Sequence, residues 1–158
     1  MWGIWRNPYD IVASIIRNDF YRRWYVGGLE EISNTIINHQ HLKALFSDFI
    51  DQANSEATIL GLLVAARNYH FFYHLQPFKC IDFEKFIINP NLAFRGLCEH
   101  FDLRNFDFTS QMPGSFNIIG KAFERNKDHK SELSKPDLKM LDKIFQPLIE
   151  LRESKFKF

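Results

Sequence analysis

One short segment of the sequence places an arginine and a serine where they could hold a phosphate group. Arg6 follows a short apolar stretch, Gly3 to Trp5, that is typical of a buried strand, and Ser14 lies two turns into the helix predicted to follow it. Ligands of open α/β folds bind at the carboxyl ends of strands. An arginine presents a planar pair of N–H donors to phosphate oxygens, which a lysine cannot reproduce. The spacing therefore predicts a site for a phosphate monoester, to which Ser14 adds its hydroxyl.

The residues between Arg6 and Ser14 explain why a helix begins there. Asn7 is a favoured N-cap, Pro8 suits the first helical position, and the charge of Asp10 suits the positive end of the helix dipole. A helix N-terminus also offers N–H groups and a positive dipole end to a bound anion. The structural alternative is that these residues form only a capped helix start with an arginine beside it.

This segment resembles the 3′-phosphate-binding motif of sulfotransferases that use 3′-phosphoadenosine 5′-phosphosulfate (PAPS). In that motif Arg-Asn-Pro-x-Asp is followed by a Ser eight positions after the Arg, and the segment Arg6–Asp10 with Ser14 keeps these residue types and this spacing. The resemblance implies that Arg6 and Ser14 hold the 3′-phosphate of PAPS or of its product 3′-phosphoadenosine 5′-phosphate (PAP). It also implies a partial P-loop-NTPase-like sulfotransferase fold of the α/β class, mostly helical with few parallel strands.

Two later segments add weaker resemblances to the same family. The stretch from Phe83 to Pro90 is similar to the family's Tyr-Glu-Asp-Leu segment, although Phe83 replaces the usual Tyr and Lys85 the usual Asp. The resemblance implies that Phe83 packs against the adenine of the cofactor without the hydroxyl of a tyrosine. Gly120-Lys121 is similar to a basic, glycine-containing loop that often precedes the final helix, which implies a contact between Lys121 and the 3′-phosphate.

The sequence lacks the loop that holds the 5′-phosphosulfate in this family. Sulfuryl transfer, like phosphoryl transfer, depends mostly on positioning and charge stabilisation, which require backbone N–H groups and a lysine around that group. None of the 7 glycines lies in a Lys-x-Gly-Thr pattern. We therefore expect residues 1–158 to be a single domain that forms the C-terminal portion of a sulfotransferase domain. Three interpretations stay open: a fragment of an enzyme, a truncated product without activity, or a chain whose missing half comes from a partner.

No catalytic residue and no metal site are assigned from the sequence. Each of the 6 histidines is predicted to be a surface or core residue, because none lies where the family has its catalytic base. A rival hypothesis is a non-catalytic module, either nucleotide-binding or a helical interaction module whose partner-binding face is the aromatic run from Tyr69 to His74. A further alternative is a nucleotide kinase of related fold, since fold resemblance alone does not settle function.

Composition limits the class of protein. A chain of 158 residues, 46% of them apolar, suits one domain with a real core, and many of its 17 phenylalanines must be buried. A net charge of +1 favours neither nucleic acid nor an anionic membrane as a partner. No stretch reaches the roughly 20 apolar residues that span a bilayer.

The cysteines and the lack of glycosylation signals bear on location. The two cysteines, Cys80 and Cys98, do not suggest a disulfide scaffold, and there is no Asn-x-Ser/Thr sequence. A cytoplasmic location is therefore expected, with the Golgi lumen as the alternative.

The apolar spacing and the helix signals predict the order of elements along the chain. Few strands are expected, and the long stretch before the last helix is predicted to be rich in loops. The expected elements are a strand at Gly3–Trp5, helices from Pro8 to about Tyr25, from Leu29 to Ile50 with an interruption near Asn38–His41, and from Glu56 to Leu75, a strand at Phe78–Phe83, a helix from Pro90, and a last helix from Lys135 to about Leu151.

Overall fold

The chain divides into two compact units, and each is described by itself. The computed structural model describes residues 3–18, 28–84, 95–96, 98–99, 101–102 and 132–156. One unit consists of Met1–Cys80 with Asp128–Phe158, and the other of Ile81–Lys127. Most of the described residues belong to the first unit.

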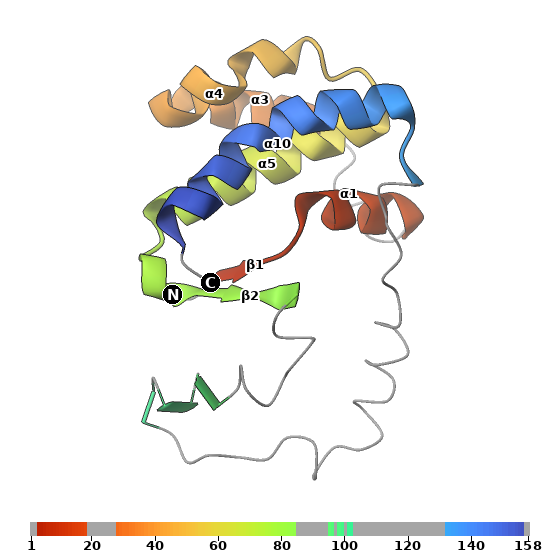
Figure 1. The fold of residues 1–158 in the computed structure, drawn as a ribbon. Helices are drawn as coiled ribbons and strands as arrows, with labels where there is room; N and C mark the ends of the chain where they lie inside the picture. Colours follow the sequence, from red (N-terminus) through yellow and green to blue (C-terminus); the bar gives the residue numbers. More distant parts are fainter. Residues whose placement is uncertain are drawn as a thin grey trace. The chain divides into compact units, whose positions relative to one another are not determined.

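The described residues are mostly helical and include a two-stranded parallel sheet (Figure 1). This confirms the predicted α/β class at the coarse level of a mostly helical chain with few parallel strands. None of the described helices is both long and apolar enough to cross a membrane. The elements are β1 (Gly3–Trp5), α1 (Pro8–Arg17), α3 (Gly28–Asn38), α4 (Gln40–Ile50), α5 (Glu56–His74), the 3₁₀ turn η1 (Pro77–Lys79), β2 (Cys80–Asp82) and α10 (Lys135–Lys155).

The helix α5 is central to the first unit, because α1, α3, α4 and α10 all contact it. A capping box fixes its start: the Thr58 N–H donates to the Ser55 hydroxyl at 3.2 Å, and the Ser55 N–H donates to the Thr58 hydroxyl at 3.0 Å. Every residue from Leu60 to Ala66 is buried. A helix that is apolar on all sides must be covered on all sides, which agrees with the four helices that surround α5.

The helix α10 packs along α5 (Figure 1). Its N-cap is Ser134, whose hydroxyl accepts the Asp137 N–H at 3.2 Å. Gly61 of α5 allows the close approach, since a Cβ there would lie 2.1 Å from Cδ2 of Leu141. The buried residues of α10 recur at helical spacing and so form one face: Leu141, Ile144, Phe145 and Leu148.

Several predicted elements are confirmed, and the end of the first helix is corrected. The strand Gly3–Trp5, the interruption of the helical region at His39 and the start of α5 agree with the structure. The predicted end of α1 near Tyr25 is wrong, because the helix ends at Arg17. Asn18 is extended (φ −110°, ψ 95°), and its N–H donates to the carbonyls of Ser14 and Ile15, which closes the helix. Residues 19–27 lie outside the described residues.

Two further boundaries differ from the prediction. The second strand is shorter than Phe78–Phe83, because Pro77–Lys79 forms a 3₁₀ turn before it. The last helix continues past Leu151 to Lys155, and its last turn carries basic residues that suit the negative end of the helix dipole. The predicted helix from Pro90 begins outside the described residues.

Candidate functional site

Arg6 lies in the short link between the end of β1 and the start of α1 (Figure 1). This is the strand-to-helix context that the sequence predicts. The side chains of Arg6 and Ser14 are both half-buried. Ser14 lies about two turns of 3.6 residues beyond the N-cap Asn7, so it is on the side of α1 on which the chain enters the helix. Arg6 and Ser14 therefore belong to one continuous segment of the first unit.

Trp5 anchors the strand side of this link. It is 5% exposed, and its ring centroid lies 5.6 Å from that of Phe72 in α5. The guanidinium carbon of Arg152 in α10 lies 5.2 Å from the Trp5 ring centroid, in a cation–π arrangement. The end of β1 is thus held by the C-terminal parts of both long helices.

Tyr9 anchors the helix side of the link. It is also 5% exposed, and its ring meets Phe145 of α10 edge-on at a centroid distance of 4.9 Å. Its hydroxyl donates to the Asp142 carboxylate, so the polar end of the side chain is satisfied. Burial, and then the hydrogen bond and charge of Asp142, raise the pKa of Tyr9 well above its usual value, which keeps the hydroxyl protonated as the donor. The link that carries Arg6 is therefore fixed at both ends.

The N-terminus of α1 offers fewer N–H groups than a helix start usually does. Pro8 has no N–H, and the Tyr9 N–H donates to Oδ1 of the N-cap Asn7 at 3.0 Å. The first two helical positions therefore have no N–H left for a ligand. The backbone of the helix start can thus donate fewer hydrogen bonds to an anion than the sequence suggests. In such a site the direct contacts to a phosphate must come mainly from the Arg6 and Ser14 side chains, and the helix dipole adds to them.

The other two predicted cofactor contacts lie in different parts of the chain. Phe83 directly follows β2, is half-buried, and belongs to the unit Ile81–Lys127. Lys121 lies outside the described residues. Arg6 and Ser14 both lie in the described segment 3–18, and the binding roles of all four residues stay predictions.

The structure also brings together three histidines that are not neighbours in the sequence. His41 comes from α4, and His70 and His74 come from the last part of α5. One ring nitrogen from each of the three lies within 4.8 Å of the others. Nε2 of His41 and Nδ1 of His70 are 3.0 Å apart, so one of them carries the proton of a hydrogen bond. The four-residue spacing of His70 and His74 indicates that they share one face of a helix. The sequence gives no indication that His41, which comes from another helix, lies beside them.

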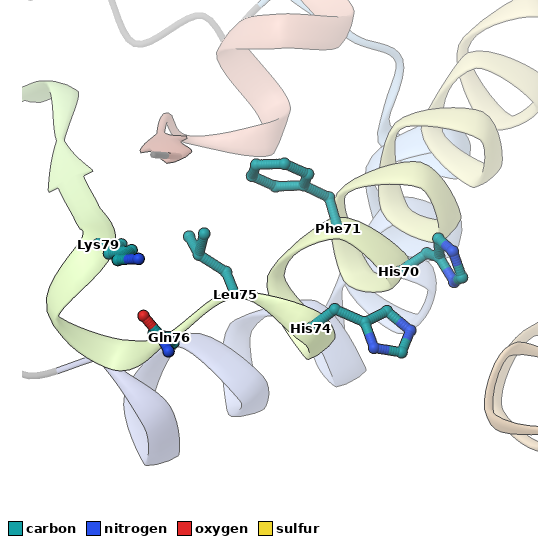
Figure 2. A pocket seen from close by; sticks show the side chains of 6 residues that line it. All are labelled: His70, Phe71, His74, Leu75, Gln76 and Lys79. Carbon is teal, nitrogen blue, oxygen red and sulfur yellow. The ribbon is translucent and has the colours of Figure 1, made fainter. Parts of the chain in front are cut away.

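A cavity of about 390 Å³ adjoins two of these histidines (Figure 2). The lining is mixed, with apolar side chains between imidazoles at one end and a lysine at the other. Figure 2 shows the imidazoles of His70 and His74 on the same side of α5, away from Lys79. The lining residues are His70, Phe71, His74, Leu75, Gln76 and Lys79.

The aromatic run from Tyr69 to His74 is divided between core and surface. Phe72 is 3% exposed and belongs to the core, and Tyr69 packs edge-on against Phe46 at a centroid distance of 5.7 Å. Tyr73 is 46% exposed and stacks on His41 at 4.7 Å. The run is therefore part core and part surface, and the interaction-module hypothesis stays a prediction.

Comparison with known proteins adds no relative to this description. No family model, curated protein or solved structure matches the chain. The functional argument therefore depends on the arrangement of the residues themselves, first of all on the link between β1 and α1.

Proposed function

We propose that this chain supplies the 3′-phosphate-binding half of a PAPS-dependent sulfotransferase, an enzyme that transfers a sulfuryl group from PAPS to a hydroxyl or amine acceptor. One observation carries the proposal: Arg6 stands between a strand end and a helix start whose flanking residues, Trp5 and Tyr9, are both buried against α5 or α10. A link held in this way presents the guanidinium from a fixed backbone. The backbone at Arg6 then loses little conformational entropy when the nucleotide binds, which favours a higher affinity.

Two side chains and the dipole of α1 are proposed to bind the 3′-phosphate. The guanidinium of Arg6 donates two charge-assisted hydrogen bonds to phosphate oxygens, and the Ser14 hydroxyl donates a third. The positive end of the α1 dipole adds a smaller favourable term. In the same proposal Phe83 packs against the adenine and Lys121 contacts the 3′-phosphate. These groups bind and orient the nucleotide, so none of them is assigned a catalytic role.

The transferred group itself is held by residues that this sequence does not contain. The Lys-x-Gly-Thr loop expected around the 5′-phosphosulfate is absent from the 158 residues. The proposal therefore requires a partner chain or a further segment to supply the N–H groups and the lysine that stabilise the transition state. The alternative, a non-catalytic nucleotide-binding module, keeps the same contacts to the 3′-phosphate.

A cytoplasmic location is part of the proposal. Cys80 and Cys98 are both thiols. The sequence contains no Asn-x-Ser/Thr acceptor for glycosylation. Both features suit a reducing compartment, in which disulfides are rare.

Nucleotide selectivity tests the proposal. We expect PAP to bind the chain at least about tenfold more tightly than ADP, because Arg6 and Ser14 contact a phosphate that ADP lacks; a tenfold ratio corresponds to about 1.4 kcal/mol. Isothermal titration calorimetry with both nucleotides in the same buffer measures the ratio. Equal affinities would instead favour a general nucleotide site such as that of a kinase. Failure of both nucleotides to bind would favour the interaction module.

A further inference from the structure

We propose that His41, His70 and His74 form a binding site for one divalent transition-metal ion, with zinc as the best match. The site lies on α4 and the C-terminal part of α5, whereas the segment proposed to hold the nucleotide lies at β1 and α1. The metal proposal does not rest on the proposed function, since neither uses a residue of the other.

The first support is the spacing of the two histidines on α5. Residues four apart on an α-helix lie one above the other on the same face. His70 and His74 have this spacing, and their ring centroids are 5.0 Å apart. Both imidazoles point to the same side of α5 (Figure 2). Two nitrogen ligands are therefore presented by one rigid element.

The second support is the position of His41, which supplies a third nitrogen from a different helix. Its ring centroid lies 5.1 Å from that of His70 and 5.6 Å from that of His74. Two Zn–N bonds of about 2.0–2.1 Å at a tetrahedral angle place their nitrogens about 3.3 Å apart. Nε2 of His41 and Nδ1 of His70 are 3.0 Å apart, and the ligand nitrogens of all three residues lie within 4.8 Å of one another. Binding one ion then requires rotation of the side chains that brings the wider-spaced nitrogens closer together.

Aromatic rings hold the imidazole of His41 in this position. Tyr73 stacks on it at a centroid distance of 4.7 Å and Tyr69 at 6.4 Å. The His41 side chain is therefore ordered by its packing beside the two histidines of α5, which lowers the cost of assembling a three-nitrogen site.

His39 lies beside the cluster but outside the assigned ligand set. Its ring centroid is 4.5 Å from that of His70, and its Nδ1 is 2.9 Å from the carbonyl oxygen of Thr35. A backbone hydrogen bond of this kind holds the ring by the N–H that it donates. His39 is therefore a neighbouring imidazole of the same residue type, which makes it a matched control for the three ligands.

The donor set indicates which metal would bind. Three neutral imidazoles suit zinc, copper, cobalt and nickel, whereas magnesium and calcium prefer oxygen ligands. Zinc accepts a set of three histidines with water or a small ligand in the fourth position. His74 is exposed, so water can reach this end of the cluster and fill the fourth position.

Zinc titration of the full chain tests the site. The protein is purified without a histidine tag, stripped with a chelator and titrated with zinc chloride in a calorimeter. We expect one ion per chain with micromolar or tighter affinity, and the absorption bands of tetrahedral cobalt when Co²⁺ replaces zinc. His70→Gln and His74→Gln should each weaken zinc binding about 100-fold, because two histidines are a poor zinc site. His39→Gln should change the affinity less than about threefold, since its nitrogen is not a ligand.

Each outcome decides for or against the assignment. His74 is exposed, so its replacement leaves the core intact, and circular-dichroism melting of the metal-free variants checks that they are folded. Binding of zinc with unchanged affinity in His74→Gln would overturn the site. Binding only at millimolar zinc, or a loss in His39→Gln as large as in His70→Gln, would also overturn it.

Discussion

Replacing Arg6 with alanine is expected to weaken PAP binding at least about 100-fold. The change removes two hydrogen bonds between charged groups, each worth about 1.5–3 kcal/mol. Because Arg6 is proposed to contact only the 3′-phosphate, the affinity for ADP should change little. Reversal of the charge in Arg6→Glu should abolish PAP binding by repulsion. Calorimetric titration of each variant with PAP and with ADP measures both effects.

Arg17→Ala is the matched control for this prediction. Arg17 lies in the last turn of the same helix, has a 43% exposed side chain and pairs with Glu132 at 2.6 Å. Its loss removes the same charge from the opposite end of α1, so PAP affinity should stay close to that of the unchanged protein. Equal losses in the Arg6 and Arg17 variants would show that PAP responds only to net charge, and the assigned contact would be wrong. Arg6→Lys should give an intermediate loss, since a lysine keeps the charge without the paired donors.

Phe145→Ala is expected to destabilise the protein by about 3–5 kcal/mol, the usual cost of removing a fully buried aromatic ring. Phe145 is 0% exposed and meets the ring of Tyr9 edge-on at 4.9 Å. The change therefore leaves a cavity in the core and also loosens the support of α1. Urea denaturation followed by circular dichroism measures the free energy of unfolding. A secondary weakening of PAP binding is expected, because the link at Arg6 loses one of its anchors.

Ile37→Ala provides the comparison for the core variant. Ile37 is a large apolar residue of α3 that is 52% exposed. Substitutions at such surface positions usually change stability by less than about 0.5 kcal/mol. An equal loss of stability in the two variants would contradict the placement of Phe145 in the core between α10 and its neighbours.

Features that depend on neighbouring residues in the sequence were predicted well. The starts of α1 and α10 follow from the N-caps Asn7 and Ser134 and from a proline just after each cap, because these signals act within one helical turn. The end of α1 was missed. The prediction continued the apolar pattern beyond Arg17, whereas the extended backbone of Asn18 closes the helix there.

Features that depend on residues far apart in the sequence were not predicted. The hydrogen bond from Tyr9 to Asp142 joins α1 to α10, which are far apart in the sequence. This bond helps to hold α1, the helix that carries Ser14, in place. The approach of His41 to His70 depends on how α4 packs on α5. Periodicity shows which face of a helix is apolar, but not which helix will cover it. The sequence therefore indicated Arg6 and Ser14, and the structure added what holds their segment in place.

The most direct test of the central claim is to locate PAP on the chain by titration with ¹⁵N-labelled protein and two-dimensional NMR. We expect the largest amide shifts at Arg6 and Asn7 and on the side of α1 that carries Ser14, and we expect ADP not to reproduce them. Shifts confined to α4 and the C-terminal part of α5, or identical shifts with PAP and ADP, would contradict a 3′-phosphate site at the start of α1.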